Sequence, residues 1–123
     1  MTTAKYQRHN GKKIIGLIES ITLEGKDGRK KEVLAKIDTG ATKGSIDINL
    51  ASELNIGPII GTKLVKSAHG NSLRPMASIK IKIAGAEVKA KFTLADRNHM
   101  KYAVLIGQNA LRKGEFLIDP KKK

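Results

Sequence analysis

One aspartate in the chain stands where a carboxylate could do acid–base chemistry. Asp38 directly follows the apolar run at residues 33–37 and precedes Thr39, Gly40 and Ala41. A carboxylate held at the end of a strand can take up or donate a proton at a fixed place, and the neighbouring glycine lets the backbone approach it. An ordinary turn aspartate that closes a strand would have similar neighbours. Three residues alone do not separate these interpretations, so a second element has to decide.

That second element lies near the end of the chain, at residues 104–111. Its members are Val104, Leu105, Ile106, Gly107, Gln108, Asn109, Ala110 and Leu111. The apolar start predicts a short core strand, and residues 108–112 predict a short helix that ends at Gly114. With the Asp38 loop, this segment resembles retropepsin-like aspartic peptidases, in which a core strand passes beside the catalytic loop and opens a short helix. The likeness covers residues 14–120.

Two further segments, residues 92–100 and 114–120, are similar to one branch of this family. The branch is RimB-like, is often labelled ATP-dependent zinc proteases and is frequently associated with RimK-type glutamate ligases. The chain has no cysteine and only three histidines, His9, His69 and His99, which lie far apart, so no zinc pattern is present. It also lacks a glycine-rich loop for ATP. We therefore expect no metal and no other cofactor.

The resemblance implies an aspartic endopeptidase with Asp38 as its catalytic residue. In such enzymes two carboxylates share one proton around a water molecule and titrate as a unit. The chain has one such motif, so a C2 homodimer would supply the second carboxylate. Thr39 would brace the two loops, Gly40 would donate its N–H, and Ala41 would leave room for substrate.

The family also implies a β-hairpin flap over the substrate. By its order along the chain, the flap is expected within residues 65–76, with His69, Gly70 and Asn71 near its tip. Glycine and asparagine suit a tight, mobile turn there. His69 is expected to be a turn residue rather than a gate.

Ile106, Gly107 and Asn109 are expected to support the catalytic loop. The chain departs from the family pattern at Gln108, where many retropepsins carry an arginine that pairs with an acid just past the catalytic loop. The acid is missing too, because Thr42, Lys43 and Gly44 follow Ala41. The usual bracing ion pair is therefore absent.

Hydrophobic periodicity predicts a mostly β protein with one or two short helices. The resemblance to retropepsin-like peptidases implies that the strands form a closed β-barrel subunit. Short strands are expected at residues 14–23, 33–37, 45–48, 104–106 and 116–118. The first two flank a turn at residues 25–28, as in a hairpin. Asn49 is the expected N-cap of a helix at residues 50–54.

The clearest periodicity lies at residues 79–94. Apolar residues alternate with lysines on both sides of Gly85, which predicts a β-hairpin with one apolar face and one lysine-rich face. Just after it, Asp96, Arg97 and His99 would suit a substrate pocket or a metal. A solvated polar loop with a local ion pair is the simpler expectation.

The charge of the chain limits its partners. Its 24 Lys+Arg against 11 Asp+Glu give a formal net charge of +13, which attracts acidic peptides, nucleic acid or acidic membranes. Two tyrosines and two phenylalanines are few for stacking nucleobases. We expect an acidic peptide or protein substrate, with oligoglutamate tails as the candidate that the resemblance implies. The alternative is a non-catalytic module that binds ribosomal or other nucleic acid.

A single domain accounts for the chain length. We expect a flexible basic arm at residues 1–13, a retropepsin-like domain at residues 14–120 and a basic tail at residues 121–123. No apolar run has the roughly 18 residues of a membrane span, and no signal-peptide core is visible. We therefore expect a cytoplasmic protein without a membrane partner. The absence of cysteine is compatible with the reducing cytoplasm.

Overall fold

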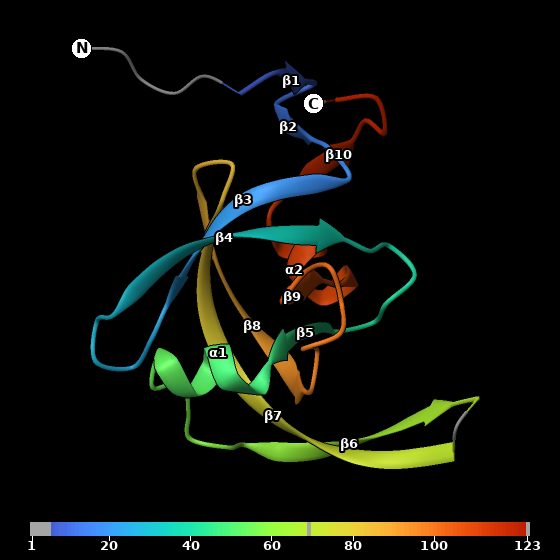
Figure 1. The fold of residues 1–123 in the computed structure, drawn as a ribbon. Coiled ribbons are helices and arrows are strands. Elements are labelled where there is room, and N and C mark those ends of the chain that lie inside the picture. The colour runs from blue at the N-terminus through green and yellow to red at the C-terminus, as the bar shows by residue number, and fades with distance from the viewer. Residues whose placement is uncertain (1–5, 69, 123) are drawn as a thin grey trace.

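The computed structural model describes residues 6–68 and 70–122, which form a β-barrel with a small second sheet beside it (Figure 1). The barrel strands follow the order β3 (Ile18–Glu24), β4 (Lys30–Ile37), β9 (Val104–Ile106), β5 (Gly44–Asp47), β8 (Ala86–Ala95) and β7 (Gly70–Ile83). β3 also pairs with β7, which closes the barrel. The predicted mostly β, closed barrel is confirmed.

Two hairpins predicted from the sequence form part of this barrel and are joined to each other by the β3–β7 pairing. β3 and β4 are antiparallel and joined by a turn in which Gly28 has a φ of +85°. β7 and β8 are antiparallel on both sides of Gly85. Their alternation places Ile79, Ile81 and Ile83 in the core while the intervening lysines are exposed.

The second sheet contains β1 (Arg8–His9), β2 (Lys12–Ile15) and β10 (Phe116–Ile118). β2 pairs in parallel with β10, and β1 pairs antiparallel with β2. Residues 8–13 were expected in a flexible arm, so that part of the expectation is wrong. The strand expected at residues 14–23 is likewise divided between the two sheets. The remainder of the arm, residues 1–5, and Lys123 of the tail lie outside the described residues.

Both short helices are present. α1 (Ile48–Glu53) begins two residues earlier than the helix predicted with Asn49 as its cap, so the cap prediction is wrong. Asp47 is the N-cap, and its Oδ2 accepts hydrogen bonds from the backbone N–H groups of Asn49 and Leu50. α2 (Gln108–Lys113) ends at Gly114 as expected. Neither helix, nor any other in the described residues, is long and apolar enough to cross a membrane.

Candidate active site

Asp38 directly follows β4, and backbone hydrogen bonds to the neighbouring β9 fix its position. The two strands are parallel, with Ile37 level with Ile106, and the backbone N–H of Asp38 donates to the Ile106 carbonyl at 2.9 Å. The Asp38 side chain is half-buried, and its Oδ1 accepts a hydrogen bond of 2.9 Å from the N–H of Gly40. The loop therefore holds the carboxylate in one orientation at the barrel surface.

The segment after β9 supports the far side of this loop. The N–H of Gln108 donates to the Ala41 carbonyl at 2.7 Å, and the N–H of Asn109 donates to the Thr42 carbonyl at 3.0 Å. The Asn109 side chain continues the connection into β8, because its Nδ2 donates to the Lys91 carbonyl at 2.9 Å. Backbone bonds of this kind leave the loop little freedom to move.

Gly107 is required by close approach rather than by backbone conformation. A Cβ atom there would lie 2.5 Å from the Lys43 carbonyl carbon and 2.9 Å from the Ala41 oxygen. No side chain fits between the two segments without moving the Asp38 loop.

Gln108 shows how the chain manages without the family's bracing ion pair. Its Nε2 donates a 2.7 Å hydrogen bond to the backbone carbonyl of Thr39. The neutral side-chain amide of Gln108 thus contacts the loop at Thr39, the residue after Asp38. The sequence alone showed the missing charges and not this substitute.

A cleft of about 360 Å³ lies between the Asp38 loop and a hairpin that extends from the barrel. The hairpin pairs β6 (Gly61–Ser67) with the first half of β7, from Gly61 opposite Met76 to Ser67 opposite Gly70. Its free end and the loop after β4 lie on the same side of the molecule in Figure 1. A hairpin is therefore present where the flap was predicted, and it spans residues 61–76 rather than 65–76. Gly70, with a φ of +111°, and Asn71 follow its tip, whereas His69 lies outside the described residues.

The cleft is basic. Among its described lining residues are five cationic side chains and no aspartate or glutamate: Lys43, Lys63, Lys66, Arg74 and Arg97. None of the five is in an ion pair within the described part of the chain. Arg97 was expected in a solvated loop with a local ion pair, and that is wrong. Asp96 instead accepts a hydrogen bond from the N–H of Asn98, and Arg97 is half-buried in the cleft wall.

The environment of Arg97 is unfavourable for a cation. Burial, and then the like charge of Arg74, lower the pKa of Arg97 below its usual value. The carboxylates of Asp47 and Asp38 oppose this shift. The Arg97 side chain is held in place by a 3.1 Å hydrogen bond from its Nε to the Tyr102 carbonyl.

Residues 49–123 match the family model described as the RimB-like, retropepsin-like aspartic endopeptidase RimB. The chain belongs to this family. The matched part includes the hairpin and the support after β9 and begins after Asp38. No curated protein matches the chain in sequence.

Solved structures agree with this family's fold. A protein of unknown function (DUF785) from Legionella pneumophila is 24% identical, with a TM-score of 0.65, over 89% of this chain and 95% of that one. The foamy viral protease-reverse transcriptase in complex with an RNA/DNA hybrid is 23% identical, with a TM-score of 0.60, over 85% of this chain and 13% of that one. The simian foamy virus protease is 19% identical, with a TM-score of 0.57, over 77% of this chain and 91% of that one.

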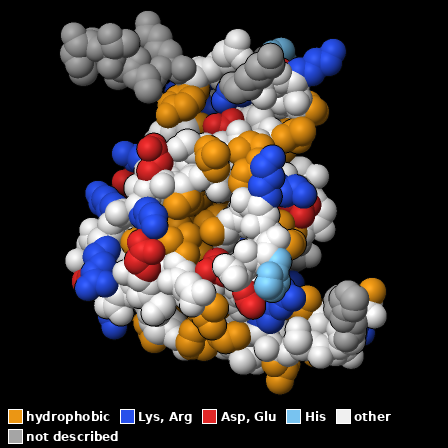
Figure 2. All heavy atoms as spheres, viewed as in Figure 1, with side chains coloured by type: hydrophobic (Ala, Val, Ile, Leu, Met, Phe, Trp, Pro, Cys, Tyr) orange, Lys and Arg blue, Asp and Glu red, His pale blue; other side chains and the backbone are white. Residues whose placement is uncertain are grey.

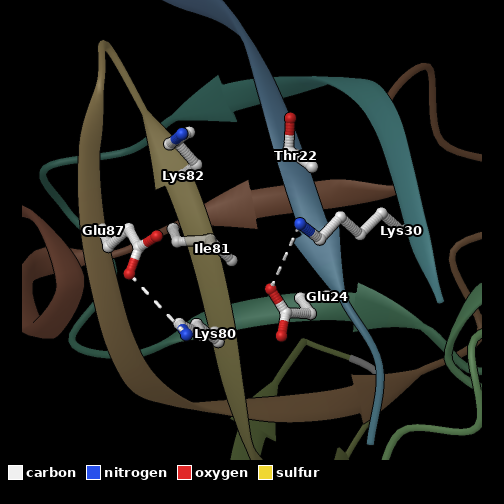
Figure 3. A pocket seen from close by; sticks show the side chains of 7 residues that line it. All are labelled: Thr22, Glu24, Lys30, Lys80, Ile81, Lys82 and Glu87. Carbon is white, nitrogen blue, oxygen red and sulfur yellow. Dashed lines mark ion pairs between the residues drawn. The ribbon is translucent and has the colours of Figure 1, made fainter. Parts of the chain in front are cut away.

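The retropepsin-like domain has a second pocket, on the barrel wall, that differs from the cleft in its charges. It measures about 260 Å³ and is lined by Thr22, Glu24, Lys30, Lys80, Ile81, Lys82 and Glu87. Figure 3 shows Lys30 directed at Glu24 and Lys80 directed at Glu87, at 4.0 Å and 3.7 Å. Residues 6–68 and 70–122 contain no group of three or more acidic, histidine or cysteine side chains that could hold a metal ion.

Proposed function

We propose that the chain is one subunit of a homodimeric aspartic endopeptidase and that Asp38 is its catalytic residue. The observation that carries the proposal is the position of the Asp38 carboxylate. It is oriented by the Gly40 N–H, in a loop held by the segment after β9, at the edge of a cleft covered by a hairpin. The family and the fold support peptide hydrolysis as the reaction.

The chemistry needs two such carboxylates. The ionised one takes a proton from a water molecule as the water oxygen attacks the peptide carbonyl carbon. The protonated one donates its proton to the carbonyl oxygen, and the tetrahedral intermediate then breaks at the C–N bond as the leaving nitrogen takes up a proton. Each chain has one Asp38, so both copies contribute to one site.

We assign the dimer interface to the surface around Thr39. Thr39 is exposed in the single chain and borders a second cleft, of about 450 Å³, which lies against α2 and β10. Apolar side chains of Leu111, Phe116 and Ile118 line it. β10 is also the last strand of its sheet, so its free edge is open to the same strand of a second copy. A twofold axis near Thr39 would bring the two Asp38 loops together.

The substrate we propose is an acidic, glutamate-rich peptide or protein segment. The five uncompensated cations of the cleft and the formal net charge of +13 support it. We also propose a cytoplasmic location, which the absence of cysteine supports.

The test is to incubate the protein with a mixed peptide pool, including glutamate-rich members, between about pH 4 and pH 8, where a shared-proton pair would titrate. Mass spectrometry identifies the products, and Asp38→Asn serves as the control. We expect cleavage that is lost in the variant, survives a chelator and rises faster than linearly with protein concentration. Peptides left intact by both proteins at every pH would contradict the proposal.

The +13 charge also favours a second candidate, a non-catalytic module that binds nucleic acid. Binding of this kind depends on phosphate contacts and weakens steeply as salt rises. If no peptide is cleaved and RNA binds with a steep salt dependence, this candidate replaces the first.

A further inference from the structure

Two arginines face the same cleft from different elements. Arg74 comes from the β7 half of the hairpin, and Arg97 from the loop after β8. Arg74 stands directly opposite Lys63 in the hairpin register. Directly opposed like charges in a sheet are destabilising. The fold thus holds cations together where their repulsion opposes folding.

Neither arginine forms an ion pair with a carboxylate among the described residues. The backbone of Arg74 pairs with β6, but its side chain has no hydrogen-bond or ion-pair partner among the described residues. Arg97 is anchored through backbone atoms instead: its N–H donates to Asp47 Oδ1 at 2.9 Å, and its Nε to the Tyr102 carbonyl. This anchoring leaves the other guanidinium nitrogens free for a ligand.

A third polar group supports the same site. Ser45 in β5 lines the cleft, is only 7% exposed and has an Oγ without a hydrogen-bond partner among the described residues. Its neighbour Thr93 is also buried, but its hydroxyl is satisfied by donating to the Gly44 carbonyl at 3.3 Å. A buried hydroxyl without a partner is unfavourable unless a ligand provides one.

We propose that Arg74, Arg97 and Ser45 form a subsite that binds a carboxylate side chain of the peptide substrate. The inference rests on the proposed peptidase function and assigns its specificity to these residues. Guanidinium groups bind carboxylates through paired N–H donors, and the serine hydroxyl adds one donor more. The cleft also includes Ala41 and Lys43, so a peptide seated there passes beside the Asp38 loop.

The cleft favours a peptide over nucleic acid as the occupant. The described residues of its lining include no aromatic side chain on which a base could stack. A side-chain carboxylate is also a smaller anion than the phosphate and base of a nucleotide, and the cleft measures only about 360 Å³.

The experiment compares matched peptides. A peptide cleaved from the pool is made again with each glutamate replaced in turn by glutamine, and kcat/KM is measured for each version. One position should show a preference for glutamate of about ten- to a hundred-fold, which is typical of charge-assisted hydrogen bonds. Arg74→Gln and Arg97→Gln should each reduce that ratio to about three-fold or less, and Arg74→Lys should retain part of it.

Lys82→Gln is the control, because it removes one positive charge from the barrel wall, at a distance from the cleft. It should leave the glutamate-to-glutamine ratio of kcat/KM unchanged. If the arginine variants cleave peptides with the wild-type ratio, the subsite is wrong while the peptidase function stands.

If wild-type protein cleaves nothing, binding of glutamate-rich and glutamine-rich peptides is compared by fluorescence anisotropy. Loss of the glutamate preference in Arg74→Gln then supports the subsite alone, and an unchanged preference overturns it. Weakened RNA binding with unchanged peptide selectivity would also overturn it.

Discussion

Two regions of this barrel carry lysines and arginines, but they differ in whether acidic side chains lie beside these cations. In the pocket on the barrel wall, Lys30 and Lys80 each lie near a glutamate. In the cleft beside the Asp38 loop, five basic side chains have no acidic neighbour among the described lining residues. Figure 2 shows that basic side chains elsewhere on the visible face have acidic side chains beside them in several places. For locating a binding site, the positive net charge is therefore less informative than the positions at which basic side chains lack acidic neighbours.

The difference separates a solvated surface from a candidate binding site. Exposed ion pairs contribute little to stability and need no function to explain them. Cations held together without a counter-charge oppose folding, so their presence in a cleft points to a ligand. The predictions below test whether the cleft and the barrel wall differ in this way.

The largest effect is expected at Gly107. In Gly107→Ala the new methyl group would meet the backbone of Lys43 and Ala41 and push the Asp38 loop away from β9. Overpacking of this kind costs about 1–3 kcal/mol, and a misplaced catalytic group reduces rates on the order of a hundred-fold. Peptide cleavage and thermal unfolding of the variant measure both. Wild-type activity in Gly107→Ala would contradict the proposed role of the loop, and Lys82→Gln is the control.

The next effect concerns the dimer. Thr39 is exposed in the single chain, so Thr39→Arg should fold normally while placing two large cations at the proposed twofold axis. We expect a monomer by sedimentation at concentrations where the wild type dimerises, with cleavage lost in parallel. A dimer that persists in the variant would place the interface elsewhere.

A smaller effect is expected at Gln108, which replaces the bracing ion pair of the family. Gln108→Ala removes the hydrogen bond to the Thr39 carbonyl. A hydrogen bond contributes about 0.5–1.5 kcal/mol net to stability, so the melting temperature should fall by roughly 2–6 °C. If the bond also positions the loop for catalysis, kcat/KM should fall roughly three- to ten-fold. Restoration by Gln108→Arg, which can donate to the same carbonyl, would support the bracing role. An unchanged rate in Gln108→Ala would contradict it.

The smallest effect is on stability, and it compares the two regions directly. Arg74→Gln should raise the melting temperature, because it removes a charge opposite Lys63. Like-charge relief of about 0.2–1 kcal/mol corresponds to roughly 1–4 °C for a domain of this size. Lys30→Gln, which removes the charge opposite Glu24 and breaks that ion pair, should leave the temperature unchanged or slightly lower. Both differences should shrink in 1 M salt. A stabilised Lys30→Gln or a destabilised Arg74→Gln would remove the contrast between the regions.

The secondary-structure elements that are determined by residues close together in the sequence could be predicted from it. The alternation around Gly85 sufficed for the β7–β8 hairpin, and Gly28 marked the turn between β3 and β4. The cap of α1 was assigned wrongly because aspartate and asparagine are equally good caps. Asp47 was selected by the position at which β5 ends, which no local pattern contains.

The sequence by itself determined the type of fold, the loop that carries Asp38 and the segment that supports it. Apolar periodicity, turn residues and a family motif are all properties of short stretches of chain. Only the tertiary structure decided that β2 pairs with β10, that Gln108 reaches Thr39, and that Arg74, Arg97 and Ser45 line one cleft. These contacts join residues far apart in sequence, and folding brings them together because the barrel and the second sheet bury one common apolar core.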